Sequence, residues 1–193
     1  MTEPTNKARQ RLLEDLLAYM RANGTGDMSL RQLATAIGTS HRMLIYHFES
    51  KTGVLISVVD AIAQRERRLI DDMFASNNQL PVVEQLRAVW HNATSTRFLE
   101  YARLFFELYG QALHGRAHTA RFLDGEIERW LEPLTGLYTS NGLASHVAGI
   151  QARLTLATIR GLLLDLLATG DREAVDLAFQ HFLGYHHPCP EAD

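Results

Sequence analysis

The stretch SLRQLATAIGTSHRMLIYHFESKTGVL, residues 29–55, holds two short helical patterns separated by Gly38. Ser29 can cap the first helix, with a glutamine three residues later as its capping-box partner. A second helix is predicted to begin at Ser40 and to end near Phe48. Glycine supplies the backbone conformation that a tight turn between helices needs. The stretch therefore predicts a helix-turn-helix.

The apolar positions of this stretch have the spacing of two crossing helices. They are Leu33, Ala34, Ile37, Leu44 and Phe48. Alanine is expected in the first helix because two helices that cross closely leave little room for a side chain. The rest of the second helix carries hydrogen-bonding and aromatic side chains and few apolar ones that a core would bury. We therefore expect these side chains to face another molecule.

The second helix of a helix-turn-helix lies in the major groove of DNA with its first residues toward base edges. Arg42 can donate two hydrogen bonds to a guanine, and Lys51 is suited to a phosphate. The N-terminus of the preceding helix offers free N–H groups to another phosphate. The predicted DNA contacts are Ser29, Arg31, Thr39, Ser40, His41, Arg42, Met43, Tyr46, His47 and Lys51. The alternatives are a solvated helix face and, for His47, a structural histidine.

The same residues carry a resemblance to a known family. Residues 8–59 resemble the N-terminal signature of TetR-family (tetracycline-repressor-like) transcriptional regulators. The matching positions are Gly38, Ser40, Leu44, His47, Phe48, Ser50 and Lys51. The family's usual tyrosine is replaced by Ile45, and Tyr46 stands one place later. Whether Tyr46 makes the family's customary phosphate contact is left open by this departure.

The resemblance implies an all-α fold of about nine helices that forms a homodimer. It implies a helix-turn-helix DNA-binding domain of three helices over residues 1–50 and a helical ligand-binding and dimerisation domain over residues 51–193. It also implies a repressor that leaves a pseudo-palindromic DNA operator when a small-molecule effector binds. In such a mechanism the effector shifts the helix that begins near Ser50, so that the two reading helices no longer fit successive major grooves about 34 Å apart.

The remainder of the chain also has helical periodicity, and no segment shows the alternation of a half-buried strand. Helices are predicted over residues 50–76, 81–92, 95–113, 119–138, 143–168 and 171–185. Pro81 fits a helix start, and Ser76, Asn77 and Asn78 fit a helix end. The sequence therefore predicts an all-α protein.

The last two predicted helices carry more apolar surface than one amphipathic face needs. Two such helices from each of two subunits form a four-helix interface with two-fold symmetry. The expected interface residues are Leu156, Ile159, Leu163, Leu166, Val175, Phe179 and Phe182. The alternative is that both helices complete the core of a monomer.

Aromatic side chains concentrate between residues 90 and 138, with polar groups interleaved. An apolar pocket with a few polar anchors suits a small ligand. The candidate ligand-binding residues are Trp90, Phe98, Tyr101, Phe105, Tyr109, Trp130, Arg153 and Thr158. The alternative is that this aromatic stripe builds a core, and the sequence does not identify the ligand.

Motifs for catalysis or metal binding are weak. The candidate ligand groups are His114 with His118, and His186 with His187 and Cys189. A glycine interrupts the first pair and the second group lies in a proline-flanked tail, so no metal and no cofactor are expected. The sequence lacks a phosphate-binding loop, a nucleophile elbow and an HExxH motif, which argues against an enzyme. The rival functions are an all-helical small-molecule carrier or enzyme without DNA binding, and a regulator without a ligand.

The charge distribution and the cysteine content limit the kind of partner and the cellular compartment. The net charge is −3 over 193 residues, but residues 1–51 carry +2 and residues 52–193 carry −5. A basic N-terminal part suggests that an anionic partner binds there. One cysteine cannot form an internal disulfide, and the N-terminus lacks the apolar stretch of a signal peptide. A soluble, cytoplasmic protein is therefore expected.

Overall fold

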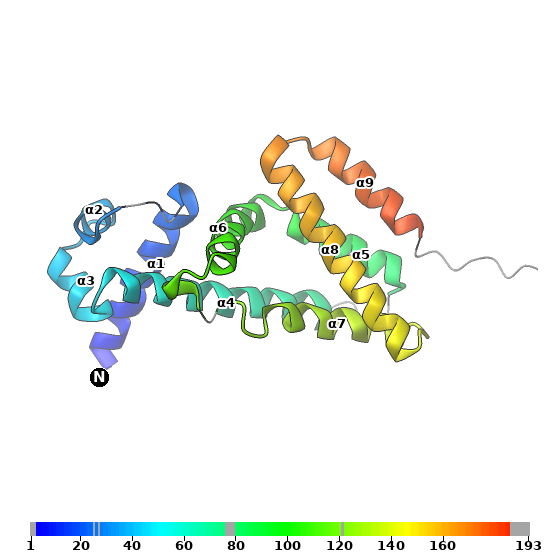
Figure 1. The fold of residues 1–193 in the computed structure, drawn as a ribbon, viewed down its shortest axis with the longest axis horizontal. Coiled ribbons are helices and arrows are strands. Elements are labelled where there is room, and N and C mark those ends of the chain that lie inside the picture. Colours follow the sequence, from blue (N-terminus) through cyan, green and yellow to red (C-terminus); the bar gives the residue numbers. More distant parts are fainter. Residues whose placement is uncertain (1–2, 25, 27, 76–79, 121, 186–193) are drawn as a thin grey trace, which may run out of the picture. The chain divides into compact units, whose positions relative to one another are not determined.

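The computed structural model describes residues 3–24, 26, 28–75, 80–120 and 122–185, which are drawn as a ribbon in Figure 1. Over these residues the chain is helical, without a strand. The helices are α1 (Glu3–Asn23), α2 (Leu30–Ala36), α3 (His41–Phe48), α4 (Lys51–Ala75), α5 (Val82–Ala93), α6 (Thr96–Leu113), the 3₁₀ turn η1 (Ala117–Thr119), α7 (Glu126–Ser140), α8 (Ser145–Thr169) and α9 (Arg172–Gly184). The prediction of an all-α fold is confirmed. The helix end expected at Ser76, Asn77 and Asn78 lies outside the described residues.

The chain divides into two compact units. The first consists of residues 1–66 and 100–124, and the second of residues 67–99 and 125–193. The first unit therefore holds most of α6, η1 and the first part of α4 together with the three N-terminal helices. These compact units do not test the expected boundary between a DNA-binding and a ligand-binding domain near residue 50, which remains a prediction.

One buried cluster holds the first unit together. Its members are Leu16, Leu17, Met20, Leu30, Leu33, Ala34, Leu44, Phe48, Val54, Leu55, Val58, Val59, Ile62, Tyr101, Leu104, Phe105, Leu108 and Phe122. Burying a leucine or phenylalanine side chain stabilises a fold by roughly 1.5–3 kcal/mol. The short helices α2 and α3 therefore depend on the longer helices α1, α4 and α6 for their stability.

Local hydrogen bonds set the ends of α2 and α3. Ser29 Oγ accepts from the Gln32 amide at 3.3 Å, and Gln32 Oε1 accepts from the Ser29 amide at 2.8 Å, so the predicted capping box is present. Gly38 has a φ of 69°, the left-handed conformation expected of the turn. Ser40 Oγ then accepts from the Met43 amide at 3.2 Å and starts α3.

The start of α7 differs from the sequence prediction. A helix was expected over residues 119–138, but α7 begins at Glu126. Gly125 has a φ of 63°, which a continuing helix cannot contain, and residues 117–119 form a 3₁₀ turn instead. The apolar spacing before Gly125 belongs to Phe122, which packs into the core of the first unit.

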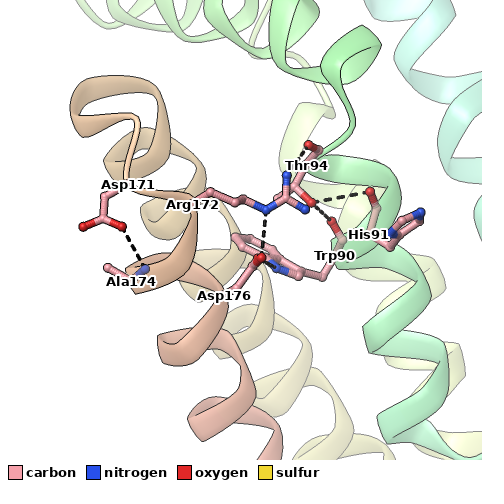
Figure 2. A network of polar contacts seen from close by, with 7 residues as sticks. All are labelled: Trp90, His91, Thr94, Asp171, Arg172, Ala174 and Asp176. Atoms are coloured by element: carbon pink, nitrogen blue, oxygen red, sulfur yellow. Dashed lines mark hydrogen bonds and ion pairs between the residues drawn. The ribbon is translucent and has the colours of Figure 1, made fainter.

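In the second unit, α9 follows α8 after a turn at Gly170, whose φ is 73°, and the two helices lie side by side (Figure 1). Figure 2 shows how α9 is held against α5. Trp90 Nε1 donates to Asp176 Oδ1 at 2.7 Å, and the Trp90 ring stacks on Phe179 with centroids 4.5 Å apart. Arg172 donates from Nε to Asp176 Oδ2 at 2.8 Å and from Nη1 to the Thr94 carbonyl at 2.9 Å. We call these five residues the α5–α9 clamp.

We expect Trp90→Phe to lower the free energy of unfolding by about 1–3 kcal/mol, because the ring is retained while a carboxylate oxygen of Asp176 loses its buried donor. Urea unfolding measures this loss. The matched control is Trp130→Phe, since Trp130 has no part in the clamp. An unchanged midpoint for Trp90→Phe would show that the hydrogen bond contributes nothing.

Among the described residues, α8 is the one helix long and apolar enough to cross a membrane by length and composition alone. The core helix of a soluble protein has the same composition when it is buried. The reason for the high apolar content is visible here, since α8 carries apolar residues on a buried face and on an exposed face.

Candidate DNA-binding site

The predicted DNA contacts all belong to the first unit, and most of them are exposed. Ser29, Arg31, Ser40, His41 and Arg42 are exposed at the N-terminal ends of α2 and α3. Met43 is 38% exposed and Tyr46 is 67% exposed, whereas Leu44 and Phe48 are buried, as the sequence predicted. Thr39 is half-buried in the turn, where its amide donates to the Ala34 carbonyl at 2.9 Å. The N-terminal half of α3 therefore presents polar side chains to solvent.

Ile45 occupies the position where the family's tyrosine is usual, and it is 39% exposed. Its side chain has no hydrogen-bonding group, so it cannot contact a phosphate as tyrosine does. Tyr46 is the more exposed of the two and its ring meets the His47 ring edge-on at 4.9 Å. A phosphate contact by Tyr46 remains a prediction.

His47 is half-buried, and its ring makes edge-type contacts with the Tyr46 and Phe48 rings, with centroids 4.9 Å and 6.4 Å apart. Its Nε2 is buried and has no hydrogen-bond partner among the described residues. This nitrogen does not face solvent, so the predicted phosphate contact cannot use it without a turn of the ring. The alternative reading, a structural histidine, fits this geometry better.

Lys51 begins α4, directly after a tight corner that joins α4 to α3. Glu49 has φ 67° and ψ −41°, the one positive φ of a non-glycine residue in the described chain. The Ser50 amide donates to the Phe48 carbonyl at 2.7 Å, which closes a three-residue γ-turn. Such a conformation costs roughly 1–3 kcal/mol and persists only where its surroundings hold it. We call residues 47–51 the α3–α4 corner.

The candidate ligand-binding residues do not form one cluster within a unit. Tyr101, Phe105 and Tyr109 belong to the first unit, where Tyr101 donates to the Ile62 carbonyl and Phe105 packs against Tyr109 and Phe122. Trp90, Phe98, Trp130, Arg153 and Thr158 belong to the second unit. Ligand binding by any of them remains a prediction.

The structure shows where two of these candidates, Trp90 and Arg153, lie within the second unit. Trp90 is 4% exposed and its polar atom is engaged in the α5–α9 clamp. Arg153 is exposed on α8, away from the buried face of that helix. The alternative of an aromatic core therefore accounts for Trp90, as it does for Phe105.

The expected dimer-interface residues need correction. Six of them are buried inside their own chain, with exposed fractions of 0–6%: Leu156, Ile159, Leu163, Leu166, Val175 and Phe179. Phe182 is half-buried and packs against Phe179, with centroids 5.9 Å apart. A side chain that fills its own core offers little surface to a second subunit, so the six buried residues are better accounted for by the alternative of a core within the chain.

A different set of apolar residues faces outward on the same helices. On α8 it recurs at intervals of three and four, at Val147, Ile150, Leu154, Ala157, Gly161, Leu164 and Ala168. Of these, Ile150 is 61% exposed and Leu154 is 56% exposed. On α9, Leu177 is 65% exposed. We call these residues of α8, together with Leu177, the α8–α9 stripe.

The second unit contains a buried charge that sequence reasoning did not identify. Glu126, the first residue of α7, is fully buried, and its Oε1 accepts a hydrogen bond from Arg160 on α8. Burial raises the pKa of the Glu126 carboxyl, and the nearby Arg160 cation opposes this rise. Near the other end of α7, the Tyr138 hydroxyl lies 2.6 Å from Thr155 Oγ1, and burial raises the pKa of Tyr138 to about 12.

In the described part of the chain, no group of three or more histidine, cysteine, aspartate or glutamate side chains could hold a metal ion. His114 is exposed, whereas His118 Nε2 lies 2.6 Å from Gln111 Oε1. Burial lowers the pKa of His118, and the positive charges of Arg116 and Lys51 lower it further. The group of His186, His187 and Cys189 lies outside the described residues.

Comparison with known proteins places this fold. No protein-family profile and no curated protein matches the sequence. Solved structures do match over nearly the whole chain. A TetR transcriptional regulator from Legionella pneumophila is 20% identical with a TM-score of 0.73, covering 91% of this chain and 94% of its own. A TetR-family transcriptional regulator from Cytophaga hutchinsonii is 15% identical with a TM-score of 0.79, covering 100% of both chains.

A third structure matches equally well. A transcriptional regulator from Saccharomonospora viridis, solved in complex with choline, is 20% identical with a TM-score of 0.74 and covers 93% of this chain and 95% of its own. At these identities a likeness establishes the fold. The chain therefore has the fold of TetR-family transcriptional regulators, in agreement with the resemblance of residues 8–59.

Proposed function

We propose that this protein, whose fold is that of TetR-family transcriptional regulators, is a sequence-specific DNA-binding transcriptional regulator. The observation that carries the proposal is the exposed N-terminal half of α3, with Ser40, His41 and Arg42 free of the core that Leu44 and Phe48 complete. An eight-residue helix anchored by two buried side chains and capped at its start is suited to enter a major groove. A helix that served only packing would not need this many exposed hydrogen-bond donors.

We propose that the regulator acts as a homodimer. A single α3 covers half of a site, whereas two copies read a pseudo-palindromic operator. The α8–α9 stripe supports this proposal, because large apolar side chains on a regular 3-4 spacing match the seam of packed helices. Gly161 and Ala157 lie in the middle of the stripe and leave room for a close approach.

We propose that the protein is a repressor released by a small-molecule effector in its C-terminal domain. The structure from Saccharomonospora viridis, with choline bound, offers a precedent for a small ligand on this fold. The chain passes from the first unit into the second within α4, so a ligand that shifts α4 changes the placement of α3. The proposal assigns no catalytic activity and no cofactor to the protein.

The proposed compartment is the cytoplasm. The single cysteine fits a reducing environment, and an apolar α8 fits a helix that has a core on one side and a second subunit on the other. An all-helical carrier without DNA binding is the remaining candidate, and the exposed donors of α3 argue against it.

We expect Arg42→Ala to weaken specific DNA binding by about 1–3 kcal/mol, because the loss of a bidentate base contact has this effect. Lys51→Ala is expected to weaken binding to all sequences and to reduce the salt dependence by about one released ion. The measurement is fluorescence anisotropy on a duplex selected from random DNA, over a range of salt concentrations. Arg11→Ala, an exposed arginine of α1, is the matched control. Wild-type protein that selects no duplex would overturn the proposed function and favour a carrier.

A further inference from the structure

We infer that Arg9 is a positioning residue for DNA reading, which holds the α3–α4 corner and thereby sets the angle at which α3 is presented. The inference rests on the proposed DNA-binding function. Arg9 lies on α1, outside the helix-turn-helix stretch, and it was not among the residues that the sequence singled out for DNA binding.

Arg9 uses its guanidinium group in three directions at once. Its Nε donates to the His47 carbonyl at 3.4 Å, and its Nη2 donates to Ser57 Oγ at 3.0 Å. Its central carbon lies over the Phe48 ring, 5.1 Å from the ring centroid. One planar group therefore connects α1 with the last turn of α3, with a buried anchor of α3 and with α4.

The contact with the His47 carbonyl satisfies a group that the helix itself leaves open. The last four carbonyls of an α-helix have no partner within the helix, and α3 has eight residues. The Ile45 carbonyl accepts from the Glu49 amide at 2.9 Å, and the Phe48 carbonyl accepts from the Ser50 amide. Arg9 supplies the donor for the His47 carbonyl, where a cation is also favoured by the helix dipole.

The corner needs such support because its backbone is strained. Glu49 holds a positive φ without being a glycine, and the γ-turn around it is a rare conformation. The Phe48 carbonyl also approaches Gly53 so closely that a Cβ at this position would collide with its oxygen. Such strain persists only where the surroundings hold it, so contacts from outside the corner stabilise this geometry.

A small change of angle at the corner is sufficient to affect DNA reading. α3 is about 12 Å long at 1.5 Å per residue, so a tilt of about 10° at its C-terminal end moves its N-terminal end by about 2 Å. Hydrogen bonds to base edges do not survive such a shift, whereas flexible side chains still reach phosphates. Loss of Arg9 should therefore reduce sequence discrimination and leave electrostatic attraction in place.

The test compares Arg9→Lys with Arg11→Lys, an exposed position of the same helix. Lysine keeps the charge and the aliphatic stem but lacks the planar fork that makes all three contacts. Anisotropy is measured on a duplex selected by the wild-type protein and on a scrambled duplex of equal composition, each at several salt concentrations. We expect Arg9→Lys to lose about tenfold or more in affinity for the selected duplex, with unchanged affinity for the scrambled duplex and an unchanged salt slope. The variant should still be folded and unfold in one cooperative transition at the temperature of the assay. Arg11→Lys should behave as wild type.

Ser57→Ala provides an independent variant, because it removes one of the three Arg9 contacts and leaves the arginine itself. We expect a smaller loss for the selected duplex, and no further loss when Ser57→Ala is added to Arg9→Lys, since both changes act through one contact. This second variant keeps the inference testable if Arg9→Lys does not fold.

Three results would overturn the inference. Wild-type affinity of Arg9→Lys for the selected duplex would remove any positioning role. A parallel loss on both duplexes with a shallower salt slope would make Arg9 a direct phosphate contact. Full additivity of Ser57→Ala with Arg9→Lys would separate the two residues. A wild-type protein that selects no duplex would instead overturn the proposed function, and the role of Arg9 with it.

Discussion

Replacing Arg160 by alanine is expected to lower the free energy of unfolding by about 3–5 kcal/mol at neutral pH, because it leaves the buried carboxylate of Glu126 without its cation. Glu126 has no exposed surface, and Arg160 is itself largely buried beside it. The pair joins the start of α7 to the middle of α8, so the loss should destabilise the second unit as a whole. Urea unfolding followed by helical circular dichroism measures it.

Two variants control this experiment. Arg65→Ala removes an arginine from the more exposed pair with Glu14 and is expected to cost at most about 1 kcal/mol. Glu126→Gln added to Arg160→Ala should recover part of the stability, because it removes the buried charge. If Arg160→Ala cost no more than Arg65→Ala, the buried pair would have no special weight.

The same pair predicts a pH dependence with a definite sign. Burial raises the folded-state pKa of Glu126 above its ordinary value of 4.5. Its contribution to stability is therefore fully present below pH 4.5 and is lost as the pH rises through the folded-state pKa. Glu126→Gln should remove this part of the pH profile. The loss caused by Arg160→Ala should also shrink at low pH, since a protonated carboxyl needs no cation.

Leu154→Asp is expected to raise the dimer dissociation constant by about 100-fold or more, corresponding to roughly 2.7 kcal/mol. Leu154 is 56% exposed within the α8–α9 stripe, and a carboxylate there would have to be desolvated on association. Sedimentation over a range of protein concentrations measures the dissociation constant. Operator affinity should fall with it, because a monomer reads half of the site.

Leu113→Asp is the matched control for this substitution. Leu113 is also an exposed leucine, 67% exposed, but it lies at the end of α6 in the first unit and outside the stripe. It should leave the dimer intact. A Leu154→Asp protein that dimerises as tightly as wild type would show that the stripe is not the interface.

The sequence alone determined the helix-turn-helix. Ser29 and Gln32 form the capping box that their spacing predicted, and Gly38 adopts the predicted left-handed turn. Leu44 and Phe48 are buried while Arg42 and Tyr46 are exposed. These features were predictable because caps, turns and helical faces depend on residues within four positions of one another.

Which apolar face of α8 is left exposed, by contrast, was decided by tertiary structure. Residues 145–169 are apolar on two faces, and periodicity gives the spacing of each face without telling which one meets the chain's own core. The sequence prediction chose Leu156 and its neighbours, which are buried in their own chain, and it passed over Leu154. The regular 3-4 spacing of the second apolar face could be read from the sequence. It identifies an exposed face only when the face that packs into the chain's own core is known.

Contacts between side chains that are far apart in the sequence likewise could not be predicted from it. Trp90 meets Asp176 across 86 positions, Glu126 meets Arg160 across 34, and Arg9 meets His47 across 38. Local patterns cannot pair such residues, because each partner lies on its own helix with an ordinary amphipathic pattern. The sequence determined which helices form and which end of α3 is polar. Only the packing of those helices decided which charges are buried, which apolar face is left exposed and which contacts Arg9 makes with α3.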